Sequence, residues 1–345
     1  MLEQASPQVL TYGDVPGEYE AGIQGCALFD QTDRGKLVVR GSEAAVFLHR
    51  ILSNDVRTLE PGQGNRNLLL TGKGKVLFDF DLAVDEDAIR ISTSPGRVEA
   101  LQAAFDTYLF TEDVQLSDET AEHAPLAVCG LAAADVVREV CGVDPPTDDH
   151  VTVEGVADGD LVRITHLPVA GSPGWRLDVA PDRVRDLWET LIERGARPAG
   201  IVARDCLRVE AASALDGVDI DENVYPQEAR LEPAFSLEKG CYIGQEVVAK
   251  IDTYGGLNKR LYALRVSHDD PVPRGTKLVQ RGDDGEAREL GIVTSWAYSF
   301  VLDTGLVLAY GKRKHQETGT SFTLDDTTAT ATIVDAPLRA GALDT

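Results

Sequence analysis

Apolar residues recur with two different periods in the first two hundred positions, one typical of helices and the other of strands. Spacings of three and four residues predict helices over 42–52, 94–109, 132–140 and 182–194. We expect Ser42 to cap the first helix and Gly195 to end the last. Alternation predicts strands over 36–40, 67–70, 75–84, 88–93, 126–130, 161–166 and 175–180, with a loop over 143–160. Helices and strands mixed in this order indicate an α+β body.

The strand expected over residues 75–84 carries acidic residues on one face. It follows a turn at 71–74 and should form a hairpin with 67–70. Alternation places four apolar side chains on one face: Val76, Phe78, Phe80 and Leu82. Asp79 and Asp81 then share the opposite face, where carboxylates can take part in chemistry.

The pattern changes after Lys259. Five short apolar runs, divided by glycine, proline and aspartate, predict strands over 262–266, 277–280, 289–298, 306–310 and 329–334. Short strands without an intervening helix are typical of a small barrel. We therefore expect an α+β region over 1–260, with a second subdomain at roughly 120–200, and a C-terminal β-barrel domain over 261–345.

The charge of the chain narrows its possible partners. Its 57 acidic residues outnumber 33 basic ones, and the formal net charge is -24. No basic excess is available to neutralise phosphates, so we expect neither nucleic acid nor an anionic membrane as a general partner. The scarcity of lysine and the even spread of carboxylates favour adaptation to high salt, with an acidic mesophilic protein as the alternative.

The cysteines indicate a reducing compartment. Five are widely spaced, without a CxxC pair or a histidine at zinc-finger spacing, so no metal site is expected. We find neither a signal peptide nor an apolar run of about 20 residues that could span a membrane. A cytoplasmic location follows as the expectation.

The octapeptide KGCYIGQE at residues 239–246 carries the densest chemistry in the chain. Gly240 and Gly244 bracket Cys241, which suggests a small accessible loop. The charge of Lys239 would favour the thiolate of Cys241, whereas Glu246 would oppose it. A reactive thiol is one interpretation, and a small buried apolar side chain is the other.

The same octapeptide resembles the K-G-C-[FY]-x-G-Q-E signature of the YgfZ family. These proteins are folate-binding relatives of the glycine-cleavage T protein and act in iron-sulfur cluster assembly or repair. Residues 204–210, 219–222 and 226–229 resemble further segments shared by T protein and its relatives, and 291–295 resembles a C-terminal one. The resemblance runs from about residue 20 to 340.

The resemblance implies a GcvT/YgfZ-like three-domain ring with tetrahydrofolate in a central channel. It implies that folate and iron-sulfur proteins or their assembly machinery are the partners. Cys241 is then the principal reactive residue, with Lys239 and Asp79 as further catalytic candidates. The candidate folate contacts are Arg204, Arg208, Glu210, Tyr242, Gly244, Gln245 and Glu246. Arg208 and Glu210 have an alternative interpretation as an ion pair on a strand. Asp219, Asp221 and Glu222 suggest a cation site, but they lack the glycine and terminal glutamate of an EF-hand, which favours a solvated acidic loop.

Two departures from T proteins bear on the reaction. T proteins carry two adjacent aspartates where this chain has Phe78 and Asp79, and a pterin-binding glutamate where it has Ser172. Phenylalanine cannot orient folate, and a serine hydroxyl cannot bind two donors as a carboxylate does. We therefore expect a YgfZ-type accessory protein. The alternative is a tetrahydrofolate-dependent aminomethyl- or methyltransferase, and a weaker one is a general thiol redox protein.

Overall fold

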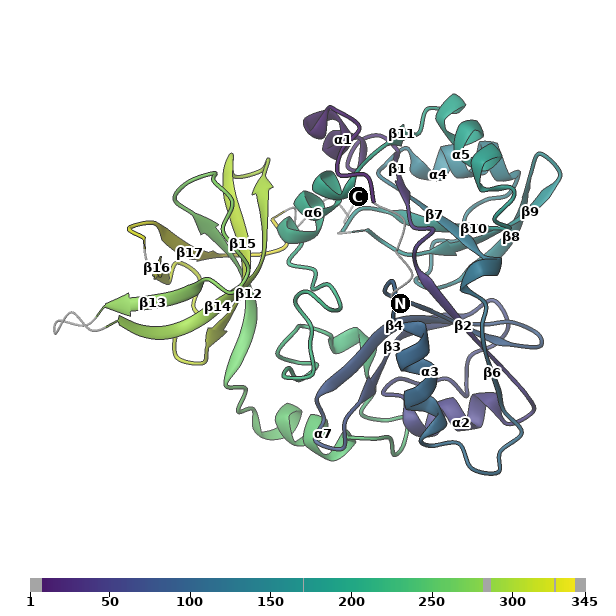
Figure 1. Ribbon diagram of the computed structural model, residues 1–345, viewed down its shortest axis with the longest axis horizontal. Helices are drawn as coiled ribbons and strands as arrows, with labels where there is room; N and C mark the ends of the chain where they lie inside the picture. Colours follow the sequence, from purple (N-terminus) through teal and green to yellow (C-terminus); the bar gives the residue numbers. More distant parts are fainter. Residues whose placement is uncertain (1–7, 170, 282–286, 326, 339–345) are drawn as a thin grey trace.

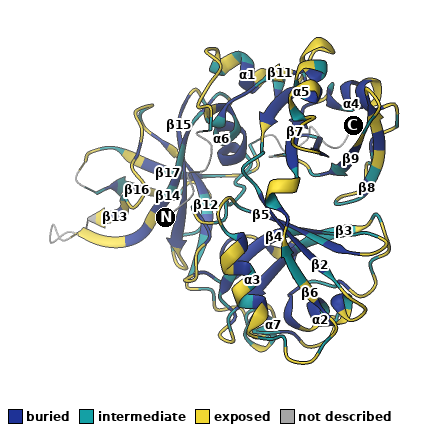
Figure 2. Cartoon of the chain, turned by 45° about the vertical axis from the view of Figure 1, so that its right-hand side comes forward, coloured by how far each residue is buried: buried dark blue, intermediate teal, exposed yellow. Residues whose placement is uncertain are grey.

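The computed structural model describes residues 8–169, 171–281, 287–325 and 327–338. It contains two β-sheets and a closed barrel, which surround the segment 211–235 (Figure 1). The strands of both sheets are mostly buried, whereas α3 and α7 have exposed outer faces (Figure 2).

The first sheet has six strands in the order β11-β1-β7-β10-β9-β8. All neighbours are antiparallel except β1 and β11. Its apolar residues pack on one face against two helices and on the other against α6. The strands are β1 (Ala27–Asp30), β7 (Ala124–Cys129), β8 (Thr152–Ala157), β9 (Asp160–His166), β10 (Gly174–Val179) and β11 (Arg197–Pro198), and the two helices are α4 (Ala133–Cys141) and α5 (Val184–Glu193).

The loop expected over 143–160 was wrong in part, because β8 lies within it. This strand is at the edge of the sheet and pairs only with β9. Its inward residues are small, Gly155 and Ala157, while Val156 faces solvent. The usual apolar alternation is therefore absent from its sequence.

The second sheet has five antiparallel strands in the order β3-β4-β5-β2-β6. Two helices cover one face and bury Phe47 and Phe105 against it. The strands are β2 (Gly35–Arg40), β3 (Gly64–Leu70), β4 (Val76–Val84), β5 (Ile89–Thr93) and β6 (Gln115–Asp118), and the helices are α2 (Ala44–Ile51) and α3 (Val98–Asp106). The cap assigned to Ser42 was wrong: Glu43 precedes the helix, and the Ser42 hydroxyl donates to Asp113 at 2.7 Å.

The alternation expected along β4 is confirmed from Phe78 onward. Phe78, Phe80 and Leu82 lie in the core under α2 and α3. A β-bulge between β3 and β4 shifts the register near Leu77, so Val76 instead lies in the core beneath α6. The carboxylates of Asp79 and Asp81 consequently face the first sheet.

The barrel has six strands, closed in the order β12-β15-β14-β13-β16-β17. The five expected strands are confirmed, and β16 was missed because only Phe322 and Leu324 of its four residues are apolar. The strands are β12 (Lys259–Val266), β13 (Lys277–Arg281), β14 (Ala287–Ser299), β15 (Thr304–Lys312), β16 (Ser321–Leu324) and β17 (Thr330–Val334). The domain boundary at residue 260 stays a prediction.

Three further helices join these parts: α1 (Val15–Ala21), α6 (Ile201–Glu210) and α7 (Gln245–Tyr254), with 3-10 turns at Thr120–Glu122 and Glu232–Ala234. Helix α6 packs on α1 and on the barrel strand β14. Arg208 and Glu210 therefore lie on a helix, and their interpretation as an ion pair on a strand was wrong.

Candidate functional site

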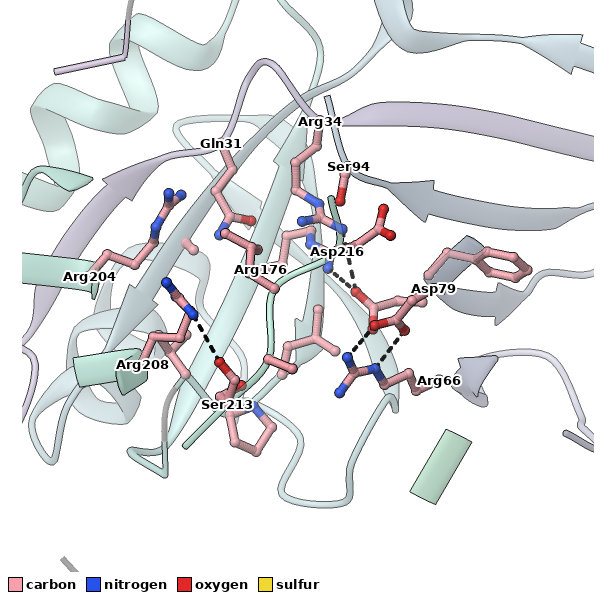
Figure 3. Close-up of a pocket in the computed structure, with 18 of the residues that line it drawn as sticks. Gln31, Arg34, Arg66, Asp79, Ser94, Arg176, Arg204, Arg208, Ser213 and Asp216 are labelled. Carbon is pink, nitrogen blue, oxygen red and sulfur yellow. Dashed lines mark hydrogen bonds and ion pairs between the residues drawn. The ribbon is translucent and has the colours of Figure 1, made fainter. Parts of the chain in front are cut away.

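A cavity of about 300 Å³ lies where the two sheets, α6 and the segment 213–216 meet (Figure 3). Its walls carry five arginines and three aspartates: Arg34, Arg66, Arg176, Arg204, Arg208, Asp79, Asp81 and Asp216. The charged side chains of this wall are therefore mostly positive, although the protein as a whole has a net charge of -24. The cavity is therefore suited to an anionic ligand.

The Asp79 carboxylate lies in the cavity, as the alternation on β4 predicts, but both of its oxygens are bound. Arg66 on β3 donates from Nε to Oδ1 at 2.7 Å and from Nη2 to Oδ2. The side chain of Asp79 is only 5% exposed. A bidentate pair of this kind fixes the carboxylate and occupies both of its oxygens, which leaves less of it available to orient a ligand.

Asp81 is the second carboxylate of β4 and connects the two sheets. Arg176 on β10 donates to it at 2.6 Å, and His150 Nε2 lies 3.3 Å from its other oxygen. Burial in the cavity wall would raise the pKa of Asp81. The hydrogen bond to His150 and the charges of Arg176 and Arg34 outweigh burial and hold this pKa well below its usual range. Asp81 therefore acts as a fixed negative charge.

Asp216 is the third carboxylate, and its Oδ2 atom has no hydrogen-bond partner among the described residues. The nearest cation is Arg97, whose Nε lies 3.6 Å away, and the Asp216 side chain is 6% exposed. Burial raises the pKa of Asp216, with Arg97 opposing and Asp79 adding to the shift. A buried acceptor without a donor is costly unless a ligand supplies one.

The two candidate arginines of α6 differ in their contacts. The Arg204 guanidinium lines the cavity and forms no hydrogen bond or ion pair with the described residues. Arg208 binds Asp205 at 3.2 Å, the carbonyl of Ser213 at 3.2 Å and Asp219 at 2.7 Å. Arg204 is therefore available to a ligand, whereas Arg208 is held by the protein.

Arg208 and Glu210 hold the barrel to the body of the protein. Arg208 donates to Ser295 on β14 at 3.0 Å, and Glu210 accepts from Ser299 at 2.7 Å and from Tyr19 at 2.6 Å. The solvated acidic loop expected around Asp219 was wrong for that residue, whose side chain is 0% exposed. Glu210 does not line the cavity, so its predicted folate contact gains no support from this geometry.

The octapeptide lies outside the cavity, in the loop before α7. Cys241 is exposed, whereas the other four cysteines are buried and free. The loop is bound to the end of α2, because the Lys239 ammonium and carbonyl both contact His49, the latter at 3.0 Å. The structure thus separates the thiol from the cavity and confirms the accessible loop.

The remaining octapeptide residues have structural positions. Tyr242 is buried beneath the ammonium of Lys239, and burial raises its pKa to about 12. Gly244 precedes α7 with a φ of 79°, and Gln245 and Glu246 form the first turn of that helix. None of them is among the residues that line the described cavity, so their predicted folate contacts stay predictions.

Phe78 and Ser172 are also absent from the cavity wall that the structure describes. Phe78 packs beneath Arg97, whose guanidinium lies 4.5 Å from the ring centroid. Ser172 is buried in a short β-bridge with Val169. The carboxylate nearest to the expected chemistry is therefore Asp79, which the regular alternation of β4 after Phe78 directs into the cavity.

Sequence reasoning missed most of the cavity wall. Arg34, Arg66, Arg176, His150 and Asp216 come from separate segments and carry no shared motif. The one available signal was Arg66, which the hairpin register pairs with Asp81 and so places on the same face as Asp79. Within the described part of the chain, no group of three His, Cys, Asp or Glu residues could hold a metal ion, and no helix is long and apolar enough to cross a membrane.

Lys239 offers a test of the loop's electrostatics. Burial, and to a lesser degree Arg57, lowers the pKa of Lys239 to about 8, although Asp55 and Cys241 oppose the shift. Amine acylation followed by peptide mass spectrometry from pH 6 to 11 should show a midpoint near 8 for Lys239. The pKa of an unperturbed lysine is about 10.4. Labelling of Lys239 and exposed Lys250 with the same midpoint would contradict this assignment.

Comparisons with known proteins identify the family. Residues 11–239 match the GCVT N-terminal domain, and residues 259–338 match the glycine cleavage T-protein C-terminal barrel domain. An aminomethyltransferase of Geobacillus kaustophilus is 30% identical over 87% of this chain and 83% of its own length. One from Thermosynechococcus vestitus is 28% identical over 87% and 81%. The crystal structure of glycine cleavage system aminomethyltransferase T from Bartonella henselae aligns with a TM-score of 0.84, 24% identity and coverage of 96% of this chain and 91% of that one. This chain belongs to the glycine cleavage T-protein family.

Proposed function

We propose that this protein binds tetrahydrofolate in the central cavity and supports iron-sulfur cluster assembly or repair through the exposed thiol of Cys241. The observation that carries the folate assignment is the pair of available groups in the cavity wall. Arg204 has no partner among the described residues, and Asp216 has an oxygen without one. In the view of Figure 3, Arg204 lies at the left end of the labelled cluster and Asp216 lies to its right, near Ser94.

These groups fit the two ends of a folate. The glutamate end carries carboxylates, which an arginine binds with charge-assisted hydrogen bonds. The pteridine end carries N–H donors, which a carboxylate accepts. The same wall includes Trp175, Val169 and Leu215, which can contact an aromatic ring. When bound, the folate would supply a carrier for one-carbon groups.

Two observations favour an accessory role over catalysis. Both oxygens of Asp79 are bound by Arg66, which leaves no free carboxylate on β4 for group transfer. Cys241 is the one exposed cysteine, and it occupies the octapeptide that resembles the YgfZ signature. A thiol outside the cavity, on a loop fixed to α2, is accessible to a macromolecular partner.

Aminomethyl transfer is the second candidate function. It is favoured by the position of Asp79 in the cavity and by relatives named aminomethyltransferase. Purified protein with tetrahydrofolate and an aminomethyl-loaded dihydrolipoyl carrier in molar KCl would then yield methylenetetrahydrofolate, ammonia and the free dihydrolipoyl carrier, and Asp79→Asn would abolish the reaction. No turnover by the wild type would count against this candidate.

Genetic complementation tests the accessory role. A salt-adapted host that lacks its own YgfZ-type protein should regain the activity of its iron-sulfur enzymes with the wild type and fail to do so with Cys241→Ser. The two proteins must accumulate equally, which immunoblotting verifies. Full rescue by the serine variant would contradict the role of the thiol.

Replacing Arg204 with alanine should weaken tetrahydrofolate binding by about tenfold to a hundredfold. A hydrogen bond to a charged group contributes about 1.5–3 kcal/mol, and Arg204 has no competing partner among the described residues. Calorimetric titration in molar KCl measures the change. Arg185→Ala on α5 is the matched control, because its side chain is 84% exposed and distant from the cavity wall. Equal affinities for both variants would reject the contact.

We also propose a cytoplasmic location in a salt-adapted cell. Five free cysteines suit a reducing compartment. The net charge of -24 suits a medium in which salt screens the repulsion between carboxylates.

A further inference from the structure

The three carboxylates of the cavity wall differ in how many of their oxygens already accept a hydrogen bond from the protein. Asp79 has both oxygens on Arg66, and Asp81 has one oxygen toward His150 and the other on Arg176. Only Asp216, among the described carboxylates of this wall, keeps an oxygen without a hydrogen bond. Among these three carboxylates, Asp216 is therefore the one with an oxygen that no protein donor occupies.

Arg97 does not satisfy this oxygen. Its Nη2 donates to the carbonyl of Leu77 at 2.7 Å, and its guanidinium lies over the ring of Phe78. Its Nε is 3.6 Å from Asp216 Oδ2, beyond hydrogen-bond reach, and is itself without a partner in the described structure. These contacts hold Arg97 close enough to stabilise the negative charge of Asp216. They do not bring it close enough to donate a hydrogen bond to the Oδ2 atom.

The backbone around Asp216 is fixed. Asp216 forms a β-bridge with Ile220, and Leu215 donates from its N–H to Asp219 at 2.9 Å. In Figure 3 the carboxylate lies near Ser94 and Arg34, on the same side of the labelled cluster as Asp79. A rigid acceptor that is 94% buried discriminates between ligands, because a ligand without a donor leaves it unsatisfied.

We propose that Asp216 is the specificity-determining residue of the cavity, whose Oδ2 accepts an N–H donor from the amino-substituted heterocycle of the ligand. The inference rests on the proposed binding of tetrahydrofolate, whose 2-amino group is the donor. Asp216 would then bind the N–H donors of the heterocycle. Ser172 cannot take this role, because it carries no charge and does not line the described cavity. Burial raises the pKa of Asp216, whereas Arg97 and a hydrogen bond with Ser94 lower it, so only the Oδ2 atom is left without a partner.

A double-mutant cycle between protein and ligand tests this contact. Wild type and Asp216→Asn are titrated calorimetrically in molar KCl with tetrahydrofolate and with its 2-desamino-2-methyl analogue. The wild type should prefer tetrahydrofolate by about tenfold to a hundredfold, and Asp216→Asn should lose most of that preference. Asp182→Asn, an exposed residue before α5, should retain it.

The outcomes separate the inference from the proposed function. If the wild type binds tetrahydrofolate but does not distinguish the two ligands, the Asp216 contact is overturned and folate binding stands. The same follows if Asp216→Asn keeps the full preference. If the wild type binds neither ligand, the proposed function and this inference both fall. Should Asp216→Asn not fold, the comparison of the two ligands on the wild type remains decisive.

Discussion

Replacing Asp219 with alanine is expected to lower the free energy of unfolding by about 3–5 kcal/mol, because it leaves the buried charge of Arg208 without its principal partner. Asp219 accepts from Arg208 at 2.7 Å, from the backbone of Leu215 at 2.9 Å and from Ser295 at 2.7 Å, and Thr294 also donates to it. The alanine variant removes all four interactions at once. Denaturant unfolding in molar KCl measures the loss.

Asp221→Ala is the matched control for this measurement. Asp221 is exposed and two residues further along the same loop, and its carboxylate accepts one backbone hydrogen bond, from Asn223 at 2.8 Å. Loss of that local contact should cost about 1 kcal/mol or less. Similar losses for the two variants would show that the Arg208 network does not hold the barrel to α6.

The role of this network explains why the sequence motifs were difficult to interpret. Arg208, Asp219 and Ser295 belong to three separate segments that resemble family motifs. Arg208 was a candidate for ligand binding, and Asp219 was interpreted as part of a solvated loop. Their contacts span up to 87 positions of the chain. Spacing within a motif carries no information about such distant partners, so only the fold reveals that these segments hold one another.

Periodicity was reliable where one face of an element meets a large core. Phe78, Phe80 and Leu82 on β4 were placed correctly, and with them Asp79. It failed at β8 and β16, which are short and carry few large apolar residues. It also failed at the β4 bulge, because a single extra residue leaves no mark in a two-residue alternation.

Of the charged residues in the cavity wall, the sequence indicated Asp79, Arg204 and Arg208 as candidates and left the others out. Arg34 precedes β2, Arg66 lies on β3 and Arg176 lies on β10, so pairing within one sheet and packing between two sheets are needed to bring them together. Asp216 lies in a segment whose conformation no periodicity describes. The groups that we propose to hold the ends of the ligand were thus beyond local patterns, apart from Arg204, which its motif indicated.

Replacing Gly244 with alanine is expected to lower the free energy of unfolding by about 2–5 kcal/mol. Its φ of 79° is strained for any side chain, which costs about 1–2 kcal/mol. A Cβ atom would also lie 2.5 Å from the carbonyl oxygen of Thr71 and 2.9 Å from the Cα of Gly74, both in the backbone of the β3–β4 turn. Overpacking of this kind adds about 1–3 kcal/mol. Chemical denaturation in molar KCl measures the sum.

Gly240→Ala separates the two contributions, because Gly240 also has a positive φ, of 101°, but no atom within 4 Å of the position of its Cβ. That variant should lose only the backbone contribution of about 1–2 kcal/mol. A larger loss at Gly244 would mean that close contact with the β3–β4 turn fixes the loop that carries Cys241. Equal losses would mean that the loop can move away from the turn. Since β4 also carries Asp79, the difference between the two variants measures how tightly the loop that carries Cys241 is packed against the hairpin that lines the cavity.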